Sequence, residues 1–259
     1  DTLGKGGEGE PAKKVDPSLG LALLGVILLD TMDMSPAAGK GTERDGAAID
    51  FLIGQTDWSR LEVPSCLHGH DVHDLFDERN IPIRSKLHDY LCNSKFDPEF
   101  WRGLSALDCL RIDYKRFHPS DGPDFGMSSV LLDMDSFLGK DDLMGSIRGF
   151  TGRDRADIPL LVVLTMRIVN GTPEREALLA GRSDLVELAG NYLAENEGAA
   201  FLEAEEIKGD PATTMIEREF KAAAGGEKEI AMMVRRFRQG NPKGSRKQVA
   251  PVLLKAMSS

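Results

Sequence analysis

The segment that most constrains the fold is the nearly continuous apolar run from Pro159 to Val169, PLLVVLTMRIV. Such a run predicts a strand that is buried on both faces of a sheet. A second strand is predicted over Phe125–Leu132, and predicted helices at 136–148 and 184–195 alternate with the strands. Strands interleaved with helices predict an α/β or α+β fold, with helices flanking a mixed β-sheet.

Other segments complete this outline. Residues 1–16 are rich in Gly, Glu and Lys and are expected to be a flexible lead-in or an insertion. Residues 63–80 are expected to be a linker. Helices are predicted at 17–30, 43–53 (with Thr42 as N-cap), 82–92, 105–111, 227–239 and 246–257, and a partly polar strand at 199–207.

Composition excludes several classes of protein. Lys plus Arg number 32 and Asp plus Glu number 42, a formal charge of −10, which argues against general coating of nucleic acid. The three cysteines have no CxxC spacing, so neither a disulfide framework nor a zinc knuckle is indicated. The longest apolar run, Leu19–Leu29, is shorter than the roughly 20 residues of a bilayer span and predicts a buried segment without a membrane role.

The charge is unevenly distributed along the chain. From Ile230 to Ser259 there is no acidic residue, so the other 229 residues carry 25 basic and 42 acidic groups, a net −17. The seven basic residues of the tail are Arg235, Arg236, Arg238, Lys243, Arg246, Lys247 and Lys255. This tail is either a binding site for an anion or a set of solvent-facing side chains on a terminal helix.

The sharpest local motif is Gly240–Gln248, GNPKGSRKQ. Ser245 followed by Gln248 fits a capping box at a helix start, where unpaired backbone N–H groups attract anions. Arg246 and Lys247 add cationic donors at the same place. The pattern indicates either a phosphate-binding turn or an ordinary capped helix, and Pro251 requires that the helix kinks or begins later.

Two further features could bind metal. Asp30 ends the first apolar run, where its carboxylate either ligates a hard cation or, as the local pattern favours, caps the following turn. The tract HGHDVHD places five potential ligands (His68, His70, Asp71, His73 and Asp74) in what is predicted to be a linker, so a solvated loop is expected, with weak adventitious metal binding as the alternative.

Three stretches together resemble one family. They are ALLGVILLDTMDM followed by GKGTERD, LSALDCLRIDYKRF leading to FGMSSVLLDMDSFL, and SRKQVAPVL. In this order they resemble the C-terminal part of DHH-superfamily phosphoesterases that carry the second type of DHH-associated domain. That group comprises eukaryotic exopolyphosphatases, Prune-type phosphodiesterases and family II inorganic pyrophosphatases.

The resemblance implies roles for particular residues. It implies that residues 17–62 end the catalytic DHH domain and that residues 81–259 form the substrate-binding domain. Asp30 matches a metal-ligand aspartate for Mn or Mg, and Arg246 and Lys247, in the turn that contains Ser245, match a cationic pair that grips terminal phosphates. Lys95 matches a further substrate lysine.

The sequence departs from the family in one feature: it contains no Asp-His-His, the motif that gives the family its name. Hydrolysis in such enzymes uses two metals, and one aspartate cannot hold a pair. We therefore expect this chain, which begins at Asp1 rather than Met, to be the C-terminal portion of a metal-dependent exopolyphosphatase. An upstream DHH segment would supply the other ligands, and the chain alone would have little activity.

Alternative functions remain at this stage. The resemblance also allows an inorganic pyrophosphatase or a Prune-like cyclic-nucleotide phosphodiesterase, and a third reading is a non-catalytic polyphosphate-binding module. The expected partners are inorganic polyphosphate or pyrophosphate and the upstream segment, without nucleic acid or membrane. The expected location is the cytoplasm, with an acidic phosphate-storing organelle as the alternative.

Overall fold

A computed structural model describes residues 14–62, 72–151, 158–170, 172–223 and 232–258 of the chain. Contacts divide it into two units, Asp1–Phe96 and Asp97–Ser259. Among the described residues, no helix combines the length and the apolar character needed to cross a bilayer.

The first unit is helical. Its helices are α1 (Pro17–Thr31), α2 (Glu43–Gln55) and α3 (Arg84–Lys95), and all three confirm helices predicted from the sequence. The Asp16 carboxylate caps α1 by accepting the N–H groups of Ser18 (3.0 Å) and Leu19 (3.1 Å). Thr42 caps α2, as its sequence predicts.

The core of this unit lies between one side of α1 and the other two helices. Leu24, Leu28 and Ile49 are fully buried there. The opposite side of α1 is exposed, with Leu19 53%, Leu23 44% and Val26 59% accessible. The predicted burial of this apolar run is therefore right for one face only, because α2 and α3 both pack against α1 from the same side.

The stretch predicted as a linker holds some local structure. The 3-10 helix η3 covers Val72–Leu75 within this stretch, the 3-10 helix η1 (Trp58–Arg60) precedes it, and residues 63–71 lie outside the described part. Leu75 is only 5% exposed and belongs to the core of the first unit. Contacts group α3 with this unit, which ends at Phe96.

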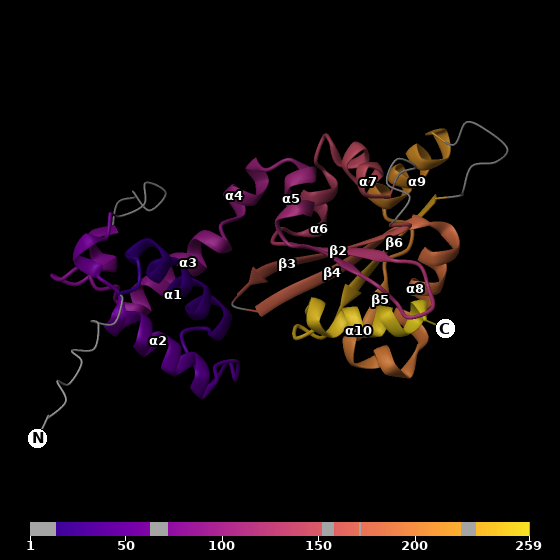
Figure 1. The fold of residues 1–259 in the computed structure, drawn as a ribbon. Helices are drawn as coiled ribbons and strands as arrows, with labels where there is room; N and C mark the ends of the chain where they lie inside the picture. Colours follow the sequence, from indigo (N-terminus) through magenta and orange to yellow (C-terminus); the bar gives the residue numbers. More distant parts are fainter. Residues whose placement is uncertain (1–13, 63–71, 152–157, 171, 224–231, 259) are drawn as a thin grey trace, which may run out of the picture. The chain divides into compact units, whose positions relative to one another are not determined.

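The second unit is built on a mixed sheet, as the sequence predicts, and this sheet has six strands (Figure 1). Its strands are β1 (Tyr114–Phe117), β2 (Phe125–Val130), β3 (Leu160–Val169), β4 (Thr172–Arg182), β5 (Ala204–Glu206) and β6 (Met232–Gln239). The spatial order is β1-β2-β3-β4-β6-β5. The β2–β3 pair is parallel and the other neighbours are antiparallel.

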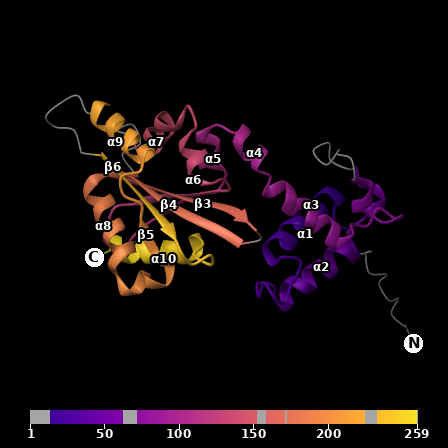
Figure 2. The ribbon, with the colours of Figure 1, turned by 180° about the vertical axis from the view of Figure 1, so that it is seen from behind.

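Helices cover both faces of this sheet (Figures 1 and 2). One face, here called the α7 face, is covered by α4 (Pro98–Gly103), α5 (Ala106–Ile112), α6 (Met134–Leu138), α7 (Leu143–Thr151) and α9 (Pro211–Ala223). The other, called the α10 face, is covered by α8 (Ser183–Glu195), the 3-10 helix η5 (Glu197–Leu202) and α10 (Arg246–Met257).

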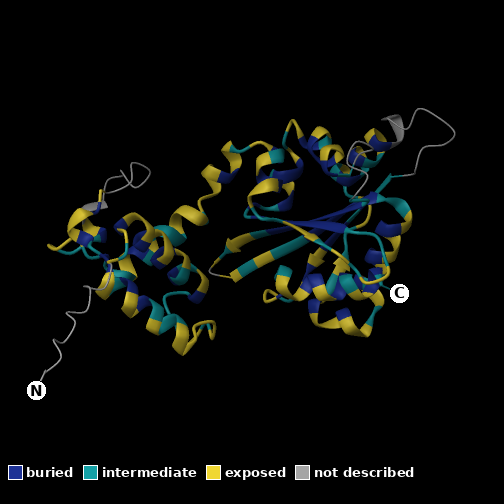
Figure 3. Ribbon diagram, in the orientation of Figure 1, coloured by how far each residue is buried: buried dark blue, intermediate teal, exposed yellow. Residues whose placement is uncertain are grey.

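The central strand β3 confirms the prediction of burial on both sides. Leu161 and Val163 pack in the core on the α7 face, whereas Leu160 and Val162 pack on the α10 face. All four side chains are fully buried, and Figure 3 shows the centre of the sheet as continuous dark blue. Alternation along a strand sends successive side chains to opposite faces, so each covering layer of helices receives its own half of β3.

Several sequence predictions need correction. The helix predicted at 227–239 is wrong over Met232–Gln239, which is strand β6; residues 227–231 lie outside the described part. The predicted strand at 199–207 is mostly η5, with β5 only at its end. The single helix predicted at 136–148 is two, α6 and α7, and strands β1 and β4 were not predicted.

The last helix confirms its prediction. It begins at Arg246 and continues through Pro251, so of the two alternatives that Pro251 raised, the later start does not occur. Proline lacks the N–H that would bond to the carbonyl of Lys247, and the helix continues without that one bond. Val252 and Leu253 hold the following turn in the core on the α10 face.

Candidate functional site

The loop that joins β6 to α10, Gly240–Ser245, is held by hydrogen bonds along its length. The Asn241 side chain donates to the carbonyl of Phe201 (2.7 Å) and accepts the N–H of Lys243 (2.9 Å). The Gly244 N–H donates to the carbonyl of Asn241 (3.0 Å), which closes a tight turn. The loop is thus ordered by its own residues and by η5 beneath it.

The start of α10 leaves two donors available. The Ser245 N–H donates to the side-chain oxygen of Gln248 (3.0 Å), the reciprocal contact of the predicted capping box. Within the described part of the chain, the N–H groups of Arg246 and Lys247 have no hydrogen-bond partner. Donors of this kind at the positive end of a helix form an anion-binding position.

The Arg246 guanidinium is fixed beside these donors. One terminal nitrogen donates to the Asp113 carboxylate (2.7 Å) and the other to the Asp113 carbonyl (2.5 Å). The Arg246 side chain is 15% exposed. Because a guanidinium has five N–H donors, three remain for a ligand after Asp113 has set the orientation. The Lys247 side chain is exposed and makes no ion pair with any described residue.

A second arginine touches the same loop from β4. The Arg175 Nε donates to the carbonyl of Pro242 at 2.8 Å. Sequence reasoning missed both Arg175 and Asp113. Asp113 lies within LRIDYKRF, one of the stretches that resemble the family, and that position was the only available signal for it.

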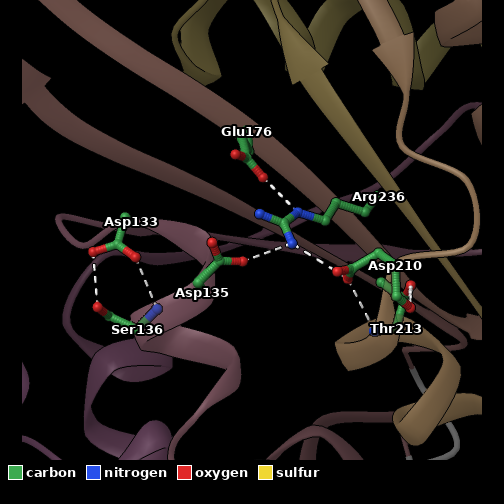
Figure 4. A network of polar contacts seen from close by, with 7 residues as sticks. All are labelled: Asp133, Asp135, Ser136, Glu176, Asp210, Thr213 and Arg236. Atoms are coloured by element: carbon green, nitrogen blue, oxygen red, sulfur yellow. Dashed lines mark hydrogen bonds and ion pairs between the residues drawn. The ribbon is translucent and has the colours of Figure 1, made fainter.

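Other cations of the C-terminal tail have structural partners. Arg235 forms a two-bond pair with Glu206 (2.6 and 2.8 Å), and this hydrogen bonding lowers the pKa of the Glu206 carboxyl. Arg236, 6% exposed, contacts Glu176 (2.5 Å), Asp135 (2.8 Å) and Asp210 (3.3 Å), as Figure 4 shows. The candidate anion-binding site is therefore limited to the basic residues around the start of α10.

Asp30, the predicted metal ligand, lies exposed in the last turn of α1. The expected capping role is wrong, because the Thr31 hydroxyl, and not the Asp30 carboxylate, accepts the Met34 N–H (3.2 Å). The turn that follows is unusual: Met32, Asp33 and Met34 all have positive φ, of 55°, 49° and 59°. Left-handed backbone at non-glycine residues is costly and concentrates at functional sites.

Lys95, the predicted substrate lysine, lies exposed near the end of α3, with its ammonium 5.7 Å from the centre of the Phe96 ring. Lys95 and Asp30 belong to the first unit, whereas Ser245, Arg246 and Lys247 belong to the second. The structure brings the last three together at one helix start. The predicted site residues thus belong to different units.

The described residues do not form a metal-binding cluster. Among them, no three His, Cys, Asp or Glu side chains gather in a way that could hold an ion. Asp30 alone does not fit a metal pair. His68, His70 and Asp71 of the histidine tract lie outside the described residues, and His73 and Asp74 fall in η3.

The class of domain is indicated by two features together: the mixed sheet, and the Arg246 and Lys247 side chains at the start of α10. The DHHA2 domain family matches residues 97–256, more than half of the chain and almost all of the second unit. The chain therefore belongs to the DHHA2 domain family, which confirms the resemblance to the DHH superfamily.

The chain is also similar in sequence to PRUNE1 exopolyphosphatases of two species. Exopolyphosphatase PRUNE1 of Rattus norvegicus is 23% identical over 252 residues, 97% of this chain and 45% of the rat protein. The human PRUNE1 exopolyphosphatase is 26% identical over 152 residues, 59% of this chain and 27% of that protein. The chain thus spans less than half the length of these relatives.

A solved structure is also similar. A Methanococcus jannaschii protein assigned to the family II inorganic pyrophosphatases aligns with a TM-score of 0.47 and 16% identity. The alignment covers 97% of this chain and 58% of the archaeal chain.

Proposed function

We propose that the second unit binds the terminal phosphates of inorganic polyphosphate at the start of α10. We also propose that the chain is the C-terminal portion of a longer protein, an exopolyphosphatase that hydrolyses those phosphates. The observation that carries the proposal is the fixed Arg246 guanidinium beside the unpaired N–H groups of Arg246 and Lys247. Fixed donors lose little freedom when a ligand binds.

Phosphate chemistry suits this arrangement. Arginine matches two phosphate oxygens with parallel N–H donors, and an exposed lysine adds a mobile point charge. The chain carries a formal −10, yet the 30 residues from Ile230 onward contain no acidic side chain. A localised cationic site on an acidic protein draws a small or extended anion to one place.

Asp30 and Lys95 enter the proposal as contributions of the first unit. Asp30 would be one ligand of a divalent metal set, with Mn or Mg, completed by an upstream DHH segment; the strained turn after it supports a functional role. Such metals supply an activated water and neutralise the attacked phosphate. Lys95 would contribute a further phosphate contact.

The first test is binding of tripolyphosphate to the full 259-residue chain. Replacing Lys247 with Gln removes an exposed charge that no described residue shares. We expect roughly tenfold weaker affinity, since one charge-assisted hydrogen bond contributes about 1.5–3 kcal/mol. Replacing Arg246 with Gln should cost more, because it also removes the group that Asp113 orients. Isothermal titration calorimetry measures both effects.

The matched control is Lys86, an exposed lysine on α3. The variant Lys86→Gln changes the net charge equally but leaves α10 intact, so its affinity should equal that of the wild type. Equal losses in Lys86→Gln and Lys247→Gln would mean that general charge, and not this site, attracts the anion.

A second candidate is a non-catalytic polyphosphate-binding module. It is favoured by the lack of a metal cluster among the described residues. The discriminating measurement is orthophosphate release from polyphosphate by the longer protein with Mg or Mn. Release that is lost in Asp30→Asn supports the exopolyphosphatase. An inert longer protein that still binds tripolyphosphate supports the module.

A further inference from the structure

Arg175 differs in its ion pairing from the other described arginines that are not exposed to solvent. Six arginines in the described part of the chain are not exposed: Arg84, Arg175, Arg182, Arg235, Arg236 and Arg246. Five of them form an ion pair with an aspartate or glutamate. Arg175 alone among these six has no carboxylate partner among the described residues, so its charge is not balanced within that part of the chain.

The position of Arg175 follows from strand alternation. Ala177 and Leu179 of β4 pack in the core on the α10 face, and Arg175 lies two residues before Ala177, so it points to that face. In the sheet it is paired with Gln239, the last residue of β6, from which the loop to α10 departs. Arg175 therefore lies where the sheet, the loop and the start of α10 meet.

The loop contact fixes the direction of the guanidinium. The Arg175 Nε is used by the Pro242 carbonyl at 2.8 Å. Pro242 lies inside the turn that the Gly244 N–H closes on Asn241. The two terminal nitrogens of Arg175 make no hydrogen bond with a described residue, which leaves four N–H donors for a ligand.

Keeping an unpaired cation in this place is unfavourable. Burial lowers the pKa of the Arg175 guanidinium, which shows that the charged form is poorly solvated there. The group nevertheless stays protonated at neutral pH, because an arginine side chain titrates far above 7. An anionic ligand can compensate a half-buried charge that has no carboxylate partner.

We propose that Arg175 is a further ligand of the condensed phosphate bound at the start of α10. This inference rests on the proposed function of that turn and adds a residue that sequence reasoning did not identify. Arg175 would approach the anion from strand β4 of the sheet. Its loop contact holds the guanidinium in place before the ligand arrives.

The test is tripolyphosphate binding to the full-length chain, measured by calorimetry at two salt concentrations. Arg175→Gln should weaken affinity about tenfold, and the remaining affinity should depend less on salt, because one screened charge pair is lost. Arg175→Lys, which keeps the charge but not the Nε contact, should recover part of the loss. A role limited to bracing the loop would not change the salt dependence.

Arg238 is the matched control. It is an exposed arginine on the neighbouring strand β6, and it points to the α7 face with Val234 and Arg236. Arg238→Gln should bind tripolyphosphate like the wild type. Thermal unfolding of each variant confirms that the fold is kept.

The outcomes separate the two proposals. If Lys247→Gln binds more weakly than the wild type, as expected, while Arg175→Gln binds as well as the wild type, the role of Arg175 is refuted and the proposed function stands. If Arg175→Lys binds no better than Arg175→Gln, the charge is not the contributing feature and the inference is also refuted. If the wild type itself fails to bind, the proposed function falls and takes this inference with it.

Discussion

At the scale of single residues, the buried Arg236 makes the clearest stabilising contacts of the second unit. Its guanidinium joins Glu176 on β4, Asp210 before α9 and Asp135 in α6 (Figure 4). The partners are 22%, 15% and 78% exposed, so two of the three carboxylates are sheltered from water. Removing the cation would leave two partly buried carboxylates without compensation.

We therefore predict that Arg236→Met lowers the free energy of unfolding by about 3 kcal/mol at neutral pH. Denaturation in urea measures the change. Arg238→Met on the same strand, which removes an exposed arginine, should change it by less than about 0.5 kcal/mol. Similar values for the two variants would show that the Arg236 contacts contribute little.

The same network should make stability depend on pH. Burial opposes ionisation of Asp210, but hydrogen bonds from Thr213 and the charge of Arg236 outweigh it and hold its pKa below the usual value. A carboxyl whose pKa is lowered by folding stabilises the protein above its unfolded pKa and loses this effect as pH falls through the folded pKa. Unfolding free energy should thus fall below about pH 4, and the fall should be smaller in Arg236→Met.

At the scale of elements, β4 depends on a glycine. Gly181 has φ of 153°, and a Cβ at this position would lie 2.2 Å from the Pro159 carbonyl oxygen. That oxygen also accepts the Arg182 N–H (2.8 Å), so the backbone cannot easily move away. Strand β4 therefore reaches its hydrogen-bonded position beside the start of β3 only with glycine here.

We predict that Gly181→Ala lowers the free energy of unfolding by about 2 kcal/mol or more. The comparison is Gly145→Ala in α7, where a Cβ would meet nothing within 4 Å. Alanine there should stabilise the helix by about 0.5–1 kcal/mol. Urea denaturation gives both values, and changes of the same sign would contradict this account.

At the scale of the whole molecule, the two units have separate cores. The second contains the entire sheet and both clusters that cover it, and it coincides with the region matched by the DHHA2 family. Domains of this size with their own core fold alone. The first unit has a smaller helical core and an exposed apolar face on α1.

We accordingly predict that residues 97–259, expressed alone, unfold in a single cooperative transition. Circular dichroism during heating measures it, with the full chain as the reference. If the proposed site is right, the same fragment should bind tripolyphosphate, because it contains Arg175, Arg246 and Lys247. If the fragment binds much more weakly than the full chain, residues of the first unit such as Lys95 contribute to affinity.

The sequence by itself determined the elements whose signals are local. The cap at Thr42, the apolar run of β3 and the turn GNPKGSRKQ are all short-range patterns, and each of these elements lies where its pattern predicts. The location of the candidate phosphate-binding turn could therefore be predicted. The family of the chain could also be predicted, because the three stretches that resemble the DHH superfamily occur in that family's order.

Only the tertiary structure decided which cations are available to a ligand. The sequence predicts a helix in place of strand β6 because the charges of Arg235 and Arg236 obscure the strand's pattern of buried residues. The carboxylate partners of these two arginines lie far away in the sequence. Asp113 is 133 residues from Arg246, and Arg175 is 67 residues from Pro242. Contacts over such separations depend on how strands are ordered in the sheet, which no short segment of the chain encodes.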